Sequence, residues 1–165
     1  MKIESAIYNF ISPQDKEFLE ILKNKKFKNL DIFLVGGAIR DILLNIVPQE
    51  LDFCINGEIS EFKEFINENQ KLKIIKVSEF ETYKILFKEK MYDFSVTRKE
   101  SYFPKGSLPK INAFNVDIET DLKRRDFTIN SIAMNIKHDL DELIDPYNGI
   151  NDLKNKIIKI IHNES

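Results

Sequence analysis

Cysteine, arginine and long hydrophobic runs are scarce or missing in this sequence of 165 residues. Cys54 is the only cysteine, which excludes an intramolecular disulfide and a zinc site built on several cysteines. No run of about 18 apolar residues is present, so a membrane-spanning helix is excluded. The polar N-terminus, Met1 to Glu4, lacks the apolar core of a secretory signal. These absences favour a reducing, cytoplasmic setting.

The composition is that of one folded domain over residues 1–165. Hydrophobic residues make up 42% of the chain, enough apolar surface to offset the entropy of ordering it. The formal net charge is −2, from 25 basic and 27 acidic residues. The strongly basic surface typical of many nucleic-acid-binding domains is therefore missing.

Arginine is used sparingly, and this makes its positions informative. Of the 25 basic residues, four are arginine, and the other 21 are lysine: the arginines are Arg40, Arg98, Arg124 and Arg125. The planar guanidinium binds phosphates and carboxylates in a bidentate way that lysine cannot reproduce. For any single arginine, a surface ion pair is the simpler interpretation. All four, however, fall within a few segments that carry other candidate site residues.

Hydrophobic periodicity and turn residues predict an α+β domain with a small mixed sheet flanked by helices. Helices are expected over 13–25, 38–45, 58–69, 117–124, 128–133 and 149–156. Strands are expected over 31–35, 50–55, 73–77, 83–88, 91–97, 134–136 and 142–144. The segment Phe103–Asn115 contains Pro104, Gly106 and Pro109 and is predicted to be a loop.

The glycine pair Gly36-Gly37 lies between a predicted strand and a predicted helix. Glycines let backbone N–H groups approach a phosphate closely, and a helix N-terminus adds positive potential. Arg40, one turn into that helix, is placed to reach the same anion. Alone, two glycines more often form only a tight turn.

Two acidic residues alternate on the next predicted strand. Glu50 and Asp52 are separated by one residue, so on a strand their side chains lie on the same face. Such a pair can hold two Mg²⁺ ions for phosphoryl or nucleotidyl transfer. A solvated acidic edge strand is the simpler alternative. If the strand 91–97 lies beside this one, Asp93 becomes a third carboxylate of the cluster.

The segment Arg124-Arg125-Asp126 combines two adjacent arginines with a carboxylate. The arginines can bind a triphosphate, and Asp126 can accept a hydrogen bond from a ribose hydroxyl. A helix start capped by Asp126, with local ion pairs, is the alternative. Arg98-Lys99-Glu100 can likewise bind phosphate or form a surface charge cluster.

These segments, in this order and spacing, resemble the class II tRNA nucleotidyltransferases and bacterial poly(A) polymerases. The resemblance rests on the following motifs: Leu34-Val35-Gly36-Gly37-Ala38-Ile39-Arg40-Asp41, Glu50-x-Asp52, Asp93, Thr97 to Tyr102, Arg124 to Asn130, and Leu143-Ile144-Asp145-Pro146-Tyr147-x-Gly149. Each motif alone is modest, but the ordered set, from about Phe33 to the end, is specific.

The resemblance implies a DNA-polymerase-β-like nucleotidyltransferase head that uses NTPs and two Mg²⁺ ions to add CMP and AMP, or AMP alone, to a tRNA or other RNA 3′ end. Carried over by position, it implies catalytic carboxylates at Glu50, Asp52 and Asp93, with Glu50 and Asp52 as metal ligands. It implies nucleotide binding by Gly36, Gly37, Arg40, Asp41, Arg124, Arg125, Asp126 and Asn130. The stretch Phe103–Asn115 falls where the family has a flexible catalytic loop.

Two departures from the family pattern stand out. Glu50 occupies a position where the family usually has Asp, and one extra methylene displaces the carboxylate by roughly a bond length. The family's neck, body and tail, which select the base and hold tRNA, are not in the sequence. We therefore expect the head domain of an enzyme acting on ATP, CTP and a tRNA 3′ end. The alternatives are a poly(A) polymerase head, a non-catalytic nucleotide- or RNA-binding module, and a small nucleotidyltransferase with another acceptor.

Overall fold

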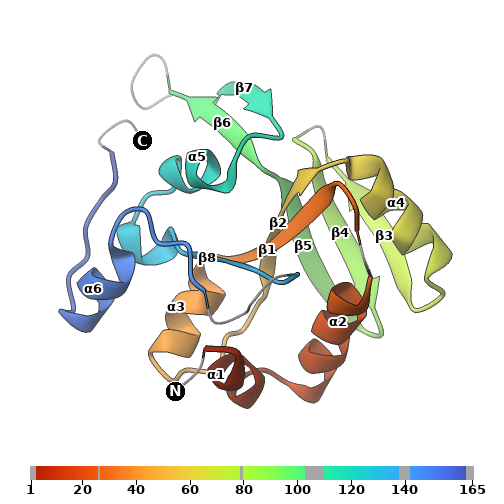
Figure 1. Ribbon diagram of the computed structural model, residues 1–165, viewed down its shortest axis with the longest axis horizontal. Coiled ribbons are helices and arrows are strands. Elements are labelled where there is room, and N and C mark those ends of the chain that lie inside the picture. The colour runs from red at the N-terminus through yellow and green to blue at the C-terminus, as the bar shows by residue number, and fades with distance from the viewer. Residues whose placement is uncertain (1–2, 26, 79, 103–109, 138–141, 163–165) are drawn as a thin grey trace.

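The computed structural model describes residues 3–25, 27–78, 80–102, 110–137 and 142–162, and it confirms the α+β class (Figure 1). Its centre is a six-stranded mixed sheet in the order β3-β4-β5-β2-β1-β8. The strands of this sheet are β1 (Leu30–Val35), β2 (Asp52–Gly57), β3 (Leu72–Val77), β4 (Thr82–Phe87), β5 (Lys90–Val96) and β8 (Ala133–Asn135). The helices are α1 (Ile3–Phe10), α2 (Pro13–Asn24), α3 (Gly37–Leu43), α4 (Ile59–Glu68), α5 (Ile118–Lys123), the 3₁₀ helix η1 (Thr128–Asn130) and α6 (Gly149–Lys154).

The pairing of β2 with β5 is parallel, whereas the other neighbours in the sheet are antiparallel. Between β2 and β5 the chain forms α4 and the outer strands β3 and β4, so β5 returns to the middle of the sheet. This crossover places Asp52 directly opposite Asp93. Two carboxylates far apart in sequence therefore lie on neighbouring strands of one sheet, at the first paired position of β2 and β5.

One face of the sheet carries the main hydrophobic core. Phe18 on α2 stacks on Tyr92 of β5, with ring centroids 3.8 Å apart. Phe53 of β2 and Phe94 of β5 stack at 4.7 Å, and Phe62 on α4 packs against Phe94 at 4.9 Å. Burying these rings, together with the aliphatic side chains around them, is the dominant stabilising contribution to such a domain.

The opposite face is covered only in part. A smaller apolar cluster joins α5 to β1, β2 and β8 through the buried residues Phe33, Val35, Cys54, Leu122 and Ala133. Beside this cluster the same face stays open to solvent, and there the polar side chains of β2, β4 and β5 are found. The fold thus leaves one polar region on the sheet, next to α5.

The structure confirms several predicted elements closely. The helix predicted over 13–25 is α2, with Ser12 as N-cap accepting a hydrogen bond from the N–H of Asp15 at 3.1 Å. The helix predicted over 58–69 is α4, and its inward residues Phe62, Phe65 and Ile66 are buried. Both segments combine an apolar face of helical period with polar residues elsewhere, the pattern from which a helix is most reliably predicted.

Other predicted boundaries are wrong. Part of the expected loop Phe103–Asn115 is a strand, β7 (Lys110–Phe114), paired antiparallel with β6 (Arg98–Ser101) as a separate two-stranded sheet. Residues 103–109 lie outside the described part of the chain. The helix expected over 128–133 is only the 3₁₀ turn η1, because Ala133 already belongs to β8. The strand expected at 142–144 reduces to a single bridge between Ile144 and Ala133.

No helix of the described residues has both the length and the apolar character needed to cross a membrane.

Candidate active site

Asp52 and Asp93 are register partners on the parallel strands β2 and β5. Together they line a cavity of about 210 Å³ on the open face of the sheet. The condition under which Asp93 was expected to join the acidic cluster, that its strand lies next to that of Asp52, is therefore met. Along the two strands, the next residues after Asp52 and Asp93 are Phe53 and Phe94, whose side chains are buried on the opposite, core face of the sheet.

Glu50 does not lie on the strand as predicted, because β2 begins only at Asp52. The buried Leu51 separates the two acidic residues, and Glu50 belongs to the exposed segment that leads into β2. Its carboxylate is nevertheless close enough to act on Asp52. Although Asp52 keeps contact with solvent, loss of surrounding water raises the pKa of its carboxyl, and the negative charges of Glu50 and Asp93 raise it further.

Lys84 on β4 neutralises Asp93. Its Nζ lies 2.7 Å from one carboxylate oxygen of Asp93 and 2.8 Å from the other. Across the described ranges of the chain, no three Asp, Glu, His or Cys side chains are gathered so as to hold a metal ion. The three predicted carboxylates are thus brought to one region, but with an ammonium group rather than an arrangement of metal ligands around Asp93.

Three of the four arginines line the cavity that contains Asp52 and Asp93: Arg98, Arg124 and Arg125. The hypothesis that the rare arginines mark the site is therefore supported by their placement. The lining of this cavity of about 210 Å³ therefore divides its charged residues between three arginines, from β6 and the end of α5, and two aspartates, from β2 and β5. Such a division suits a metal-bound anion, with arginines on its anionic groups and carboxylates on its metal.

Asp121 holds this arginine cluster together. Its side chain is fully buried, and Oδ1 accepts hydrogen bonds from the backbone N–H of Arg98 and from Nε of Arg124, both at 3.0 Å. Nη2 of Arg125 lies 3.6 Å from Oδ2. Burial disfavours the charge of Arg124, but Asp121, helped by Glu100, outweighs this and raises the pKa of the guanidinium. Arg124 thus stays charged although it is largely shielded from water.

Gly36 and Arg125 are in close contact. Gly36 has φ +74° and ψ −138°, a conformation that suits glycine, and a Cβ placed on it would lie 3.1 Å from Nη1 of Arg125. The buried Nε of Arg125 has no hydrogen-bond partner in the part of the chain that the structure describes.

A second cavity, of about 480 Å³, adjoins Asp52 on its other side. Its lining includes five of the predicted site residues: Gly37, Arg40, Asp41, Glu50 and Asp52. Nε and Nη2 of Arg40 both donate to Oδ1 of Asp41, and Nη1 donates to Oδ1 of Asn130 at 2.8 Å. Asn130, on η1, thereby fixes Arg40 of α3 over the N-terminal turn of its own helix.

Asp126 is the predicted site residue that stands apart. It is exposed between α5 and η1, and it lines neither of these two cavities. Its backbone carbonyl accepts a hydrogen bond from the N–H of Ile161 at 3.0 Å, which ties the C-terminal segment to the arginine pair.

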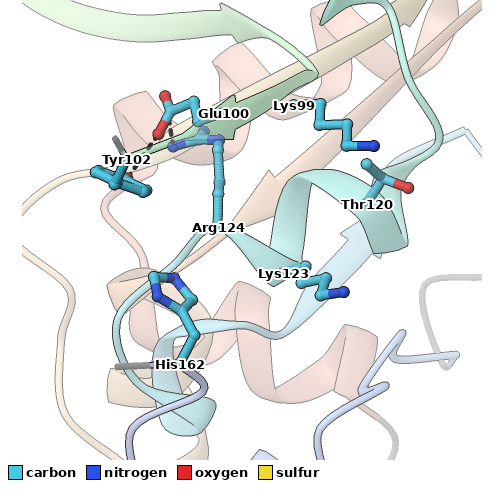
Figure 2. A pocket seen from close by; sticks show the side chains of 7 residues that line it. All are labelled: Lys99, Glu100, Tyr102, Thr120, Lys123, Arg124 and His162. Atoms are coloured by element: carbon cyan, nitrogen blue, oxygen red, sulfur yellow. Dashed lines mark hydrogen bonds and ion pairs between the residues drawn. The ribbon is translucent and has the colours of Figure 1, made fainter. Parts of the chain in front are cut away.

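A third cavity, of about 230 Å³, is also lined by Arg124 (Figure 2). Glu100 stands between Tyr102 and the guanidinium of Arg124, with Lys99 and Lys123 across the cavity (Figure 2). The Glu100 side chain is only 3% exposed. Its carboxylate accepts hydrogen bonds from Nε of Arg98 at 2.6 Å and from the Tyr102 hydroxyl at 2.8 Å. Glu100 is thus a second buried carboxylate that positions the arginines, and not a surface charge.

The thiol of Cys54 supplies no nucleophile. Its complete burial raises the pKa to about 11, and the charge of Asp121 acts in the same direction. The thiol therefore stays protonated near neutral pH, where only a thiolate would react.

The sequence reasoning missed Asp121, Glu100 and Lys84 as site residues. Asp121 stands three residues before Arg124, a helical spacing that favours an ion pair and could have indicated it. The contacts of Lys84 with Asp93 and of Glu100 with Arg124 depend on strand pairing and on the approach of α5 to β6. No local signal in the sequence reports either.

Residues 32–159 match the family model described as the poly A polymerase head domain. The chain belongs to the poly A polymerase head domain family. The match contains all of the predicted site residues, from Gly36 to Asn130, and it confirms the family that the motifs resembled. Enzymes of this nucleotidyltransferase family generally use a divalent metal ion.

The curated relatives of this poly A polymerase head domain include two kinds of enzyme. The A-adding tRNA nucleotidyltransferase of Aquifex aeolicus is 33% identical over 134 residues, which are 81% of this chain and 16% of the relative. The CCA-adding enzyme of Enterococcus faecalis is 30% identical over 148 residues, 90% of this chain and 35% of the relative. The chain thus spans about a third or less of these relatives.

Solved structures confirm the DNA-polymerase-β-like nucleotidyltransferase fold of the head domain. The apo form II of a CCA-adding enzyme superposes with a TM-score of 0.82 at 27% identity, covering 98% of this chain and 38% of that one. The Thermotoga maritima CCA-adding enzyme in complex with tRNA gives a TM-score of 0.73 at 25% identity, covering 98% of this chain and 36% of that one.

Proposed function

We propose that this chain is the catalytic head of an enzyme that adds CMP and AMP, or AMP alone, to the 3′ end of tRNA. The observation that carries the proposal is the cavity where Asp52 and Asp93 face Arg98, Arg124 and Arg125. The relatives are named for A addition and for CCA addition, and both kinds match similarly well. We therefore leave the added nucleotide to experiment and place the reaction, with its NTP and tRNA substrates, in the cytoplasm.

The carboxylates would hold the divalent metal. Asp52 and Asp93, with Glu50 beside them, offer only oxygen donors, which Mg²⁺ prefers. The pKa of Asp52 is raised in part by its two acidic neighbours, so the site carries negative charge that a cation would neutralise. We propose that two Mg²⁺ ions bind there. When bound, such ions activate the RNA 3′-hydroxyl and stabilise the charge of the phosphates.

The arginines would bind the triphosphate. In the proposed reaction the 3′-oxygen of the RNA forms a bond to the α-phosphorus of the NTP, the bond to the β-phosphate oxygen breaks, and pyrophosphate leaves as the hydroxyl proton is lost to solvent. Negative charge develops on the leaving pyrophosphate, and Arg125, which lines the cavity of Asp52 and Asp93, is placed to stabilise it. Asp121 and Glu100 hold the arginines in position before substrate arrives.

Gly36, Gly37 and Arg40 would form the other wall. Without a Cβ at Gly36, a phosphate can approach the backbone beside Arg125. Asn130 and Asp41 keep the Arg40 guanidinium above Gly37, where a Cβ would lie 3.3 Å from Nη2. In this proposal Asp126 contacts the ribose, as the resemblance implies.

The test is nucleotide addition by a chimaera. This chain replaces the matching segment of the Enterococcus faecalis CCA-adding enzyme, and the chimaera is incubated with Mg²⁺, labelled CTP or ATP, and a tRNA transcript lacking its terminal CCA. We expect the chimaera to add at least one nucleotide. We expect Asp52→Ala to lower the rate of addition by more than about 10³-fold. Glu58→Gln removes an exposed carboxyl that lines neither cavity of the site, and it should leave the rate of addition unchanged.

Other outcomes separate the alternatives. A folded chimaera that binds NTP but transfers nothing would indicate a non-catalytic binding module. Mass spectrometry of other RNA and protein acceptors, incubated with the unmodified chain and labelled NTPs, would detect a different acceptor. Equal addition by Asp52→Ala and the parent chimaera would reject the site assignment.

A further inference from the structure

We propose that Lys84 is the cation that occupies Asp93 before a metal binds, and that it lowers the metal affinity of the site by competing for that carboxylate. The inference rests on the proposed function, because it takes Asp52 and Asp93 as metal ligands. It assigns Lys84 as a positioning residue that acts through Asp93.

The geometry places the ammonium group where a metal would have to bind. Lys84 and Asp93 are opposite residues of the antiparallel pair β4 and β5. Nζ contacts both oxygens of Asp93, at 2.7 and 2.8 Å, so neither is left without a cationic partner. Thr82, two residues earlier on the same face of β4, lines the cavity of Asp52 and Asp93.

A divalent ion on Asp93 must share these oxygens with the ammonium group. Two cations at hydrogen-bonding and coordination distances from one carboxylate repel each other, so the ammonium group must move away when the metal binds. The side chain of Lys84 is 42% exposed and has a flexible four-carbon stem, so it can move into solvent.

The size of the effect follows from the exposure of the pair. Lys84 and Asp93 side chains are each 42% exposed, and exposed ion pairs are worth little in water. Removing the lysine charge should therefore strengthen metal binding by roughly two- to fivefold.

The experiment measures Mn²⁺ binding to the chain by electron paramagnetic resonance, with no nucleotide and no turnover. Binding at this site is defined as the part lost in Asp52→Asn. The test variants are Lys84→Met and Lys84→Thr, and Lys84→Arg keeps the charge. Lys71→Met is the matched control, since Lys71 is paired with Glu17 at 3.2 Å and lines none of the three cavities described above. Thermal melting shows that each variant is folded.

We expect Lys84→Met and Lys84→Thr to bind Mn²⁺ roughly two- to fivefold more tightly than the unmodified chain, with Lys84→Arg and Lys71→Met unchanged. Unchanged or weaker binding in both neutral variants, while Asp52→Asn still removes the site, would overturn the role of Lys84 and leave the proposed function standing. Binding that is identical in the unmodified chain and in Asp52→Asn would reject both the metal site and the role of Lys84.

Discussion

Asp121 is the single residue on which the arginine cluster depends most. Its fully buried carboxylate accepts hydrogen bonds from the Arg98 backbone and from the Arg124 guanidinium, and Arg125 is within 3.6 Å. A buried ion pair adds little net stability compared with hydrophobic residues of similar volume. Removing one partner, however, leaves the other charge buried and uncompensated. This carboxylate therefore fixes the positions of the arginines more than it adds net stability.

Asp121→Asn should destabilise the fold by about 2–4 kcal/mol, because the two guanidinium groups lose their buried counter-charge. Urea denaturation of the chain measures this directly. Asp117→Ala, which removes the exposed N-cap of the same helix, should cost only about 1 kcal/mol. Equal losses in the two variants would show that Asp121 acts as an ordinary helix residue.

Asp52 is expected to weaken the fold at neutral pH when no metal is present. Its pKa is raised in the folded state by lost hydration and by Glu50 and Asp93, so the folded chain holds the proton more tightly than the unfolded chain. The stability that protonated Asp52 contributes is therefore fully present below pH 3.8, the ordinary pKa of its carboxyl. This contribution is lost as the pH rises through the pKa of Asp52 in the folded state.

Asp52→Asn should accordingly raise the melting temperature at pH 7 in the presence of EDTA, and the gain should disappear as the pH falls below about 4. Differential scanning calorimetry across this pH range measures both effects. Glu58→Gln serves as the control for removing an exposed carboxyl. A melting temperature lowered by Asp52→Asn at pH 7 would contradict the charge crowding.

At the scale of elements, the motif Asp145-Pro146-Tyr147-x-Gly149 joins α6 to η1. The Asp145 carboxylate accepts from the N–H groups of Gly149 at 2.7 Å and Ile150 at 2.9 Å, so it caps the start of α6. A Cβ on Gly149 would lie only 2.2 Å from the backbone oxygen of Thr128. This close approach positions η1, and with it Asn130, the partner of Arg40.

Gly149→Ala should push η1 away from α6 and cost about 1–3 kcal/mol, since the added methyl meets backbone and cannot be accommodated by a side-chain rotation. Asp145→Ala should cost about 1 kcal/mol through the lost cap. Denaturation curves rank the two variants. A neutral Gly149→Ala would show that α6 is free to move relative to η1.

The elements that the sequence predicts well are those set by local patterns. The apolar face and Ser12 cap of α2, and the alternation of β5, depend on residues within the element itself. β7 was missed because its residues are mostly exposed and lack alternation, and only pairing with β6 makes them a strand. Glu50 was placed on β2 because alternation alone cannot locate where a strand begins.

At the scale of the whole molecule, one face of the sheet packs the core and the other carries the proposed active site. One face packs the aromatic core of Phe18, Phe53, Phe94 and their neighbours, and the other exposes Asp52, Asp93 and Lys84 beside α5. The α+β class could be predicted from the sequence, and the ordered motifs indicated the family. The parallel pairing of β2 with β5, on which the site depends, could not, because strand order is set by contacts distant in sequence.

The most direct test of the metal-and-phosphate site is calorimetric titration of this chain with non-hydrolysable analogues of CTP and ATP, with Mg²⁺ and with EDTA. We predict binding of at least one analogue that requires Mg²⁺ and weakens by about tenfold or more in Asp52→Ala, but not in Glu58→Gln. Binding of equal strength with EDTA, or unchanged by Asp52→Ala, would contradict the account.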